Sequence, residues 1–208
     1  MMGTRNEIHA ISTGKQSIEK LTAIAATIHP FVDAIHIREK SRSAIEIYHI
    51  VEKLADKEVP LSKIIINDRA DVASACKVNG VHLAHHSLPI RPVKKQFPGL
   101  RAGYSCHSPD EALTAEQEGA DYLFYGHVFP TKSKPGLPPK GLDQLREVCR
   151  LVQIPVIAIG GVNVENLQDI KLAGARGIAV MSGFFEAADP YQAAKQMFQV
   201  MNRTGGIW

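Results

Sequence analysis

The feature that most constrains the fold of this chain is a regular alternation of short β-branched runs with longer amphipathic stretches. The short runs predict strands at Ile8–Ser12, Ala34–Arg38, Lys63–Asn67, Gly80–Leu83, Arg101–Ser105, Tyr122–Gly126, Pro155–Ile159 and Gly177–Met181. Helical patterns lie between them at Ser17–Ile28, Ser43–Lys57, Val72–Val78, Pro89–Phe97, Pro109–Glu118, Leu142–Leu151, Val164–Ala173 and Pro190–Asn202. Apolar strands joined by helical crossovers indicate a parallel sheet covered on both faces.

An open doubly wound sheet would give a similar alternation, but about eight units with short connections favour closure into a (β/α)₈ TIM barrel. The 208 residues suit such a barrel as a single domain, since α/β barrels run to roughly 200–250 residues. We therefore expect one α/β domain over residues 1–208, with residues 1–5 as a flexible N-terminal tail. No GxGxxG follows the first predicted strand, so a Rossmann site has no support.

Composition excludes several classes of function. The net charge is +3 with acidic and basic residues interspersed, so no basic block predicts nucleic-acid binding. The first residues have no apolar signal core, and no apolar run reaches about 18 residues, so a cytoplasmic protein without a membrane partner is expected. The cysteines Cys76, Cys106 and Cys149 are too widely spaced to predict a disulfide framework or a zinc site.

Glycines follow the last two predicted strands. Gly160 and Gly161 follow the seventh, and Met181, Ser182 and Gly183 follow the eighth. Glycine lets a backbone approach a ligand closely and present its N–H groups, and these two loops of barrels often bind phosphate. Tight turns alone would explain either pair. Both pairs together, in these positions, favour a phosphate site, where Gly183 and the residues after it could begin a short helix.

Several short motifs lie at the ends of predicted strands. They are His36-Ile37-Arg38-Glu39-Lys40, Ile66-Asn67-Asp68-Arg69, Gly80-Val81-His82-Leu83, Gly103-Tyr104-Ser105-Cys106-His107-Ser108, Tyr125-Gly126-His127-Val128-Phe129-Pro130-Thr131, Ala158-Ile159-Gly160-Gly161 and Ala179-Val180-Met181-Ser182-Gly183. With these motifs in this order, the chain resembles the thiamin phosphate synthase/TenI superfamily of (β/α)₈ barrels over nearly its whole length.

The synthases of that superfamily join a pyrimidine diphosphate to a thiazole phosphate, and two aspartates hold Mg²⁺ on the diphosphate. At the places that match these synthases, the chain keeps the same residues at Arg38, Lys40, Asn67, Asp68, Ser105, Thr131, Ser133 and Lys134. The chain departs at three places: His36 replaces a glutamine, Ala84-His85-His86-Ser87 replaces a glycine-glutamine-acid-acid run, and His127 replaces a proline.

Loss of a carboxylate should weaken Mg²⁺–diphosphate binding, because Mg²⁺ prefers oxygen ligands. His85 and His86 are adjacent, so one metal cannot easily take both, and we expect solvent-facing loop histidines. The Gly126-His127-Val128-Phe129 segment resembles the TenI branch. That likeness implies a thiazole tautomerase, an isomerase of bacterial thiamin synthesis that aromatises a carboxythiazole phosphate ester without metal or other cofactor. His127 would be its acid/base catalyst, a task suited to an imidazole near neutral pH. From its position alone, His127 could instead be a structural histidine that bonds a neighbouring loop.

The remaining site candidates have alternatives. Arg38 and Lys40 could bind the substrate carboxylate or phosphate, or form ion pairs with Glu39 or Asp68.

Asn67, Ser105 and Thr131 are further substrate-binding candidates; Asn67 and Ser105 could hydrogen-bond the ring or its carboxylate, or serve the loops. Lys134 could close over the phosphate from a mobile loop at 132–140. His107 could carry a proton or be structural, and His82 is expected in the core.

Two other functions stay open. One is the synthase reaction, which is supported by the matching residues Asp68, Thr131, Ser133 and Lys134. The other is a non-catalytic regulator that senses a phosphorylated metabolite. A homodimer is possible from sequence, because apolar helix faces could pair.

Overall fold

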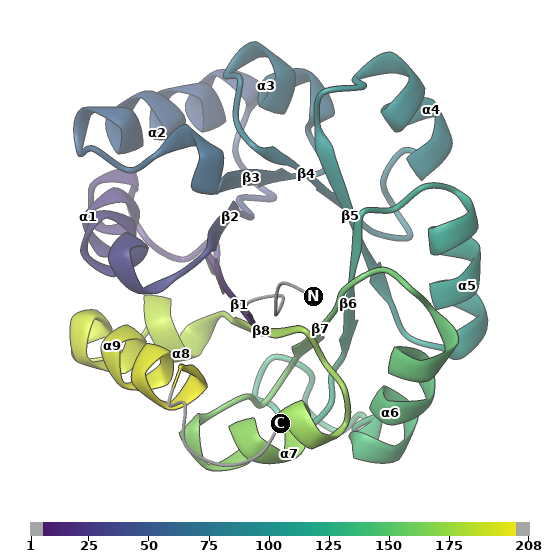
Figure 1. Ribbon diagram of the computed structural model, residues 1–208. Coiled ribbons are helices and arrows are strands. Elements are labelled where there is room, and N and C mark those ends of the chain that lie inside the picture. Colours follow the sequence, from purple (N-terminus) through teal and green to yellow (C-terminus); the bar gives the residue numbers. More distant parts are fainter. Residues whose placement is uncertain (1–5, 203–208) are drawn as a thin grey trace.

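The computed structural model describes residues 6–202, and the predicted tail at residues 1–5 lies outside them. Eight parallel strands form a closed barrel in sequence order, from β1 next to β2 round to β8 next to β1. In Figure 1 the strands form an inner ring and the helices surround it. The prediction of an eight-stranded α/β barrel is confirmed.

The elements alternate along the chain. The strands are β1 Glu7–Ile11, β2 Ala34–Ile37, β3 Ile64–Asn67, β4 Gly80–Leu83, β5 Arg101–Cys106, β6 Tyr122–Gly126, β7 Val156–Ile159 and β8 Gly177–Val180. The helices are α1 Ile18–Ile28, α2 Ala44–Asp56, α3 Ala70–Ala75, α4 Ile90–Gln96, α5 Pro109–Gln117, α6 Gly141–Leu151, α7 Leu167–Leu172, α8 Ser182–Phe185 and α9 Pro190–Met201. Short 3₁₀ helices are η1 His29–Phe31, η2 Leu61–Lys63 and η3 Val164–Asn166.

Helix starts follow the capping residues in the sequence. Ser17, Ser43, Ser108 and Asp189 each accept a hydrogen bond from a backbone N–H in the first turn of the following helix. Such side chains satisfy donors that have no partner inside the helix. The caps therefore fix where α1, α2, α5 and α9 begin.

Two helices differ from the sequence-based expectation. The expected helix at Val72–Val78 is α3, which begins at Ala70 and ends at Ala75, because Lys77 adopts a left-handed conformation with φ 53. The expected helix at Val164–Ala173 is divided into η3 and α7, and Asn163 caps η3.

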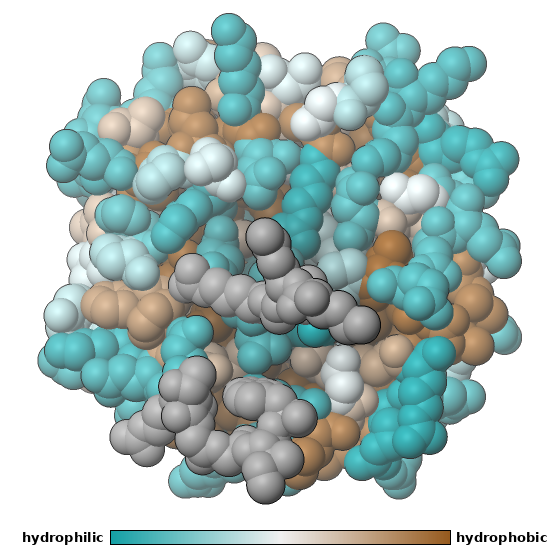
Figure 2. Space-filling model, viewed as in Figure 1, coloured by the Kyte–Doolittle hydropathy of each residue, from teal (hydrophilic) through white to brown (hydrophobic). Residues whose placement is uncertain are grey.

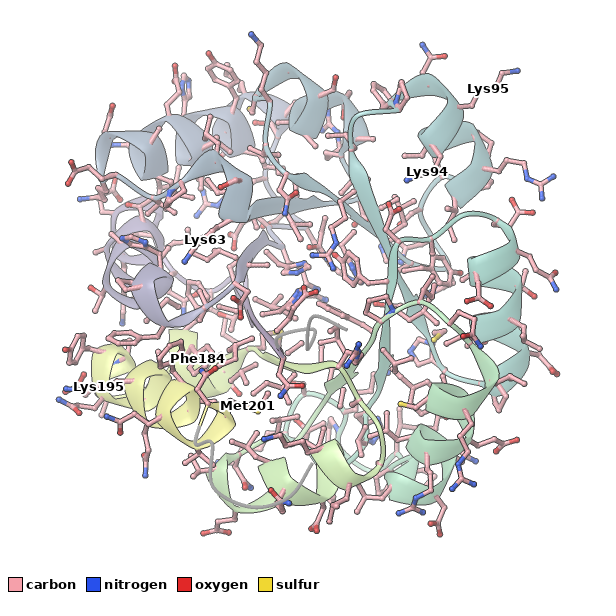
Figure 3. The ribbon with its side chains drawn as sticks, viewed as in Figure 1. Lys63, Lys94, Lys95, Phe184, Lys195 and Met201 are labelled. Atoms are coloured by element: carbon pink, nitrogen blue, oxygen red, sulfur yellow. The ribbon has the colours of Figure 1, made fainter. Side chains whose placement is uncertain are left out.

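The main hydrophobic core lies between strands and helices, whereas the space enclosed by the strands is partly polar. His9, His36 and His82 are fully or almost fully buried there with Tyr122 and Phe124. Their rings contact one another, with centroids 5.1 Å apart for His9 and His36 and 4.2 Å apart for His82 and Phe124. In Figure 3 nitrogen- and oxygen-bearing side chains lie inside the ring of strands, while Lys95 and Lys195 point outwards.

The outer surface is mixed in character. Figure 2 shows hydrophilic side chains over most of the face in view, with apolar groups between them. Among the described helices, none is both long enough and apolar enough to cross a membrane.

Candidate active site at the carboxyl ends of the strands

The parallel strands bring the predicted site residues to one end of the barrel. Every strand runs parallel to both neighbours, so their carboxyl ends meet at a single mouth. Arg38, Asn67, Ser105, Gly160 and Met181 stand at the ends of five different strands or directly after them. Active sites of such barrels are built at this end from the loops that follow the strands.

Two cations at the end of β2 keep their charge available. The side chains of Arg38 and Lys40 form no ion pair with any residue in the range 6–202. Glu39, between them, instead accepts from Ser12 Oγ at 2.6 Å and pairs with Arg42 Nε at 3.1 Å. The Glu39 side chain is only 1% exposed. The alternative in which Glu39 or Asp68 neutralises these cations is therefore not what the fold forms.

Asp68 follows β3 and faces the segment after β4. Its carboxylate accepts a short hydrogen bond from Ser87 Oγ, and its second oxygen lies 3.3 Å from Nε2 of His86. His85 and His86 are both exposed, as expected for loop histidines. Within the described part of the chain, no group of three or more His, Cys, Asp or Glu side chains could hold a metal ion by itself.

Ser105 is tied to the barrel interior. His82 Nε2 lies 2.8 Å from Ser105 Oγ, and Nδ1 lies 3.1 Å from the Tyr122 hydroxyl. Burial lowers the pKa of His82 to about 3, with a smaller contribution from His9. His82 is thus a neutral core histidine with partners on both nitrogens, as expected from its place in an apolar strand. It orients Ser105 at the floor of the mouth.

His127 is turned toward the loop that follows β6. Its side chain is buried, and Nε2 lies 3.3 Å from the carbonyl oxygen of Leu137. The backbone N–H of Lys140 donates to the His127 carbonyl at 2.8 Å. The residue therefore contacts the 132–140 loop at Leu137 and at its last residue, Lys140.

The same loop carries Lys134 to His107. Lys134 Nζ lies 3.3 Å from His107 Nε2, and the pKa of His107 is lowered by burial and then by the Lys134 charge. His107 also lies 3.5 Å from a Glu111 oxygen. Thr131 Oγ1 accepts from the Ser133 N–H at 3.3 Å inside the loop. Lys134 is thus held over the end of β5, and Thr131 shapes the turn that leads to it.

The two glycine loops lie side by side because β7 pairs with β8. Gly160 and Gly161 have φ values of 93 and 68. A Cβ on Gly160 would lie 2.2 Å from the His127 Cβ, and one on Gly161 would lie 2.5 Å from the Pro130 carbonyl oxygen. Only glycine fits either position. The first N–H groups of the short helix α8, at Ser182 and Gly183, have no carbonyl partner within the helix.

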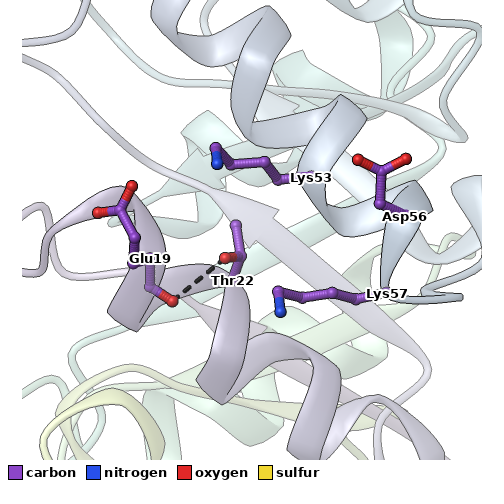
Figure 4. Close-up of a pocket in the computed structure, with 5 residues that line it drawn as sticks. All are labelled: Glu19, Thr22, Lys53, Asp56 and Lys57. Carbon is purple, nitrogen blue, oxygen red and sulfur yellow. Dashed lines mark hydrogen bonds between the residues drawn. The ribbon is translucent and has the colours of Figure 1, made fainter.

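A separate groove lies outside the barrel between α1 and α2. It has a volume of about 310 Å³ and is lined by Glu19, Thr22, Lys53, Asp56 and Lys57. Figure 4 shows these side chains, with the bond from Thr22 Oγ1 to the Glu19 carbonyl dashed. None of the predicted site residues lines it, so it is no part of the mouth.

The closed ring of parallel strands with helices outside it is a (β/α)₈ barrel of the TIM type, with cations, an aspartate and glycine loops at its mouth. The family model described as "Thiamine monophosphate synthase" matches residues 8–184, and the chain belongs to that family.

Full-length relatives agree with the family match. The chain is 34% identical to the thiamine-phosphate synthase of Pyrococcus abyssi, over 99% of this chain and 100% of that protein. It is 41% identical to the one from Chlorobium luteolum, over 82% of each. Thiamine phosphate pyrophosphorylase from Pyrococcus furiosus superposes with a TM-score of 0.83 at 32% identity, covering 98% of each chain.

The expectation of a thiazole tautomerase, and hence of an isomerase, was wrong. The relatives above are named as synthases, which are transferases. The loss of one acidic position was given too much weight, because Mg²⁺ can be held by one carboxylate together with substrate phosphates. The role of His127 as an acid/base catalyst stays a prediction, and its Nε2 contacts a loop carbonyl in this structure.

Sequence reasoning missed a buried hydrogen-bonded line from Glu7 through His9 to His36. Its only sequence signal was polar residues at alternate positions of two apolar strands, Glu7 and His9 in the first and His36 in the second. Such residues share the interior face of the barrel.

Proposed function

We propose that this chain is a thiamine-phosphate synthase, a transferase that joins a pyrimidine diphosphate to a thiazole phosphate. The bond from the pyrimidine methylene carbon to the diphosphate oxygen breaks, a bond from that carbon to the thiazole nitrogen forms, and diphosphate leaves. The observation that carries the proposal is similarity to synthases over the full length of both chains. The two unpaired cations at the mouth support it.

The charge on the diphosphate sets the roles of the basic residues. Arg38 can hold two phosphate oxygens through its planar guanidinium, and Lys40 adds a point charge. Lys134, held over the end of β5 by His107, is a third cation that would contact the leaving diphosphate. A departing diphosphate gains charge as the carbon–oxygen bond breaks, so fixed cations stabilise the transition state more than the ground state.

The phosphate of the thiazole substrate is assigned to the glycine loops. Gly160 and Gly161, with Ser182 and Gly183 across the β7–β8 pair, bring backbone N–H groups to the mouth where no side chain intervenes. Met181 links β8 to α8 as the residue that precedes the helix. Asn67 and Ser105, both partly exposed, supply polar contacts for a heterocycle at the floor.

His127 has a positioning role in this proposal. It links the 132–140 loop to the end of β6 through the Leu137 carbonyl and the Lys140 N–H. Because Gly160 packs directly on it, His127 also holds the phosphate loop in place.

The residues around Asp68 accommodate a Mg²⁺ carried by the diphosphate. A carboxylate with a hydroxyl beside it, at Asp68 and Ser87, is an oxygen donor set of the kind this ion prefers. When bound, Mg²⁺ would neutralise charge on the diphosphate. Asp68 is held by Ser87 and His86, so its carboxylate is oriented before the substrate arrives.

The test is synthesis of thiamin phosphate from pyrimidine diphosphate, thiazole phosphate and Mg²⁺, with diphosphate release measured in parallel. We expect equal amounts of both products. Binding of either substrate without any turnover would refute the proposal and favour a sensing protein.

A variant pair locates the activity. Arg38→Met should lower kcat/KM for the pyrimidine diphosphate by about 100-fold, as loss of a charge-assisted hydrogen bond predicts. The matched control is Lys95→Met, which removes an exposed cation on α4 and should leave kcat/KM unchanged. Equal effects of the two variants would contradict the placement of the diphosphate at Arg38.

A further inference from the structure

Two histidines at the ends of neighbouring strands contact the loop at 132–140. β5 pairs with β6, and His107 and His127 each follow the last residue of one of these strands. His127 Nε2 lies 3.3 Å from the Leu137 carbonyl oxygen, whereas His107 Nε2 lies 3.3 Å from Lys134 Nζ. The first contact is to the backbone of the loop. The second is to a charged side chain, so His107 influences where that charge lies.

The ring of His107 is oriented from its other side by a carboxylate. An ammonium group only donates hydrogen bonds, so His107 Nε2 must accept from Lys134 and carry no proton. The ring proton of the neutral imidazole is then on Nδ1, which lies 3.5 Å from Glu111 Oε2. The same oxygen accepts the backbone N–H of His107 at 2.7 Å. Glu111 thus fixes both the backbone and the tautomer of His107, and the ring presents a lone pair to the lysine.

The charges around His107 leave its ring neutral near neutral pH. Burial lowers the pKa of His107, and the nearby charge of Lys134 lowers it further. Lys140, in the same loop, acts in the same direction, whereas Glu111 on α5 opposes them. The net effect is a pKa below the usual 6.5. A neutral ring can hold an ammonium group without cancelling its charge, whereas a carboxylate in the same place would form an ion pair with it.

We propose that His107 is a positioning residue that acts through Lys134. It holds the ammonium group over the end of β5 as a cation that no acidic side chain in residues 6–202 neutralises. The inference rests on the proposed synthase function, in which the diphosphate of the pyrimidine substrate meets this cation. Protonation of the ring would place two positive charges 3.3 Å apart, so acid should release Lys134 from its position.

The contact is tested first without substrate. The pKa of His107 is followed by NMR of histidine-labelled full-length protein, and its signal is identified by its loss in His107→Gln. Lys134→Met should raise that pKa toward 6.5, because a neighbouring positive charge is removed. The matched control is Lys132→Met, which removes an exposed cation of the same loop and should leave the pKa unchanged. Equal shifts in the two variants, or no shift in Lys134→Met, would overturn the proposal.

Steady-state kinetics test whether the histidine acts through the lysine. His107→Leu removes the acceptor and should raise KM for pyrimidine diphosphate about three- to tenfold, as loss of one partly exposed hydrogen bond predicts. KM for thiazole phosphate should not change. The double variant His107→Leu/Lys134→Met should have the KM of Lys134→Met alone, because residues that act as one unit have non-additive effects. Equal rises in both KM values in His107→Leu, or additive losses in the double variant, would show a general structural role and overturn the proposal.

The pH dependence gives a further test with a defined sign. In the wild type, kcat/KM for pyrimidine diphosphate should fall in acid, below the pKa that NMR gives for His107. Glu111→Gln removes a charge that raises this pKa, so the fall should move to lower pH by the same interval as the pKa. Titration of the substrate is the same in both proteins and cancels in the comparison. A fall that stays in place while the pKa moves would overturn the proposal.

Failure of the proposed function can be distinguished from failure of this inference. A wild-type protein without synthase turnover would overturn the proposed function and the assignment of the diphosphate to Lys134. The pKa of His107 in Lys134→Met would still decide whether the histidine holds the lysine, because that measurement needs no turnover.

Discussion

Acid should unfold this barrel largely through its buried histidines, and His82 gives the clearest case. The folded-state pKa of His82 is about 3, against 6.5 for the free side chain. Below pH 6.5 the unfolded chain binds a proton that the folded chain refuses. The free energy of unfolding therefore falls as pH drops from 6.5 toward 3.

The magnitude follows from that interval. Each pH unit is worth about 1.4 kcal/mol, so His82 contributes a loss of about 5 kcal/mol over the whole range and about 2 kcal/mol between pH 7 and pH 5. A domain has a free energy of unfolding of about 5–15 kcal/mol in total. The effect of this single buried imidazole is therefore large enough to measure by urea denaturation.

The perturbation is His82→Gln, which keeps a polar side chain beside the Ser105 and Tyr122 hydroxyls but does not titrate. The variant should lose about 2 kcal/mol less than wild type when urea titrations at pH 7 and pH 5 are compared. His49→Asn, on the exposed surface of α2, is the control and should follow wild type. Parallel losses in His82→Gln and wild type would refute the assignment of acid sensitivity to His82.

Three further predictions concern the mouth. Gly160→Ala should lower the free energy of unfolding by about 2–4 kcal/mol in urea titrations, since a left-handed backbone and a close contact both oppose a methyl group. Gly99→Ala is the control and should change the free energy of unfolding little, because there is open space around Gly99. Similar losses in the two variants would contradict the packing argument. Asp68→Asn should raise the Mg²⁺ concentration for half-maximal synthase rate about tenfold or more; an unchanged Mg²⁺ dependence would remove Asp68 from the metal. Lys134→Ala should raise KM for pyrimidine diphosphate several-fold at unchanged Tm, and a normal KM would place the loop away from the diphosphate.

The order of strands and helices could be predicted because it depends on local periodicity and on caps. Ser108 followed by Pro109, for example, fixes the start of α5 wherever the rest of the chain lies. The end of α3 could not, because the left-handed turn at Lys77 carries no glycine or asparagine to announce it. Local rules thus predict element starts better than element ends.

The contents of the mouth could be predicted as positions but not as contacts. Residues at strand ends meet at one end of any parallel barrel, so Arg38, Asn67 and Ser105 could be placed at the mouth from the order of the elements alone. Whether Glu39 turns to Arg38 or to Arg42 depends on packing against Ser12, 27 residues earlier in the chain. The orientation of His127 toward Leu137 depends likewise on the path of a loop.

The barrel interior holds buried polar side chains beside apolar ones. Ile11, Ile65 and Ile157 pack inside the same barrel with Phe124, so apolar side chains could fill this space. Buried imidazoles instead bring desolvation and acid sensitivity, and replacing buried polar networks by apolar residues is often neutral or stabilising.

The line from Glu7 through His9 to His36 is such a network. It joins an ionised carboxylate at one end of the barrel to neutral imidazoles in its interior. The same burial that makes the protein sensitive to acid keeps those imidazoles neutral. A charged His9 or His36 would have to be solvated in the barrel interior, so acid should break these hydrogen bonds and lower the free energy of unfolding through the same protonation events.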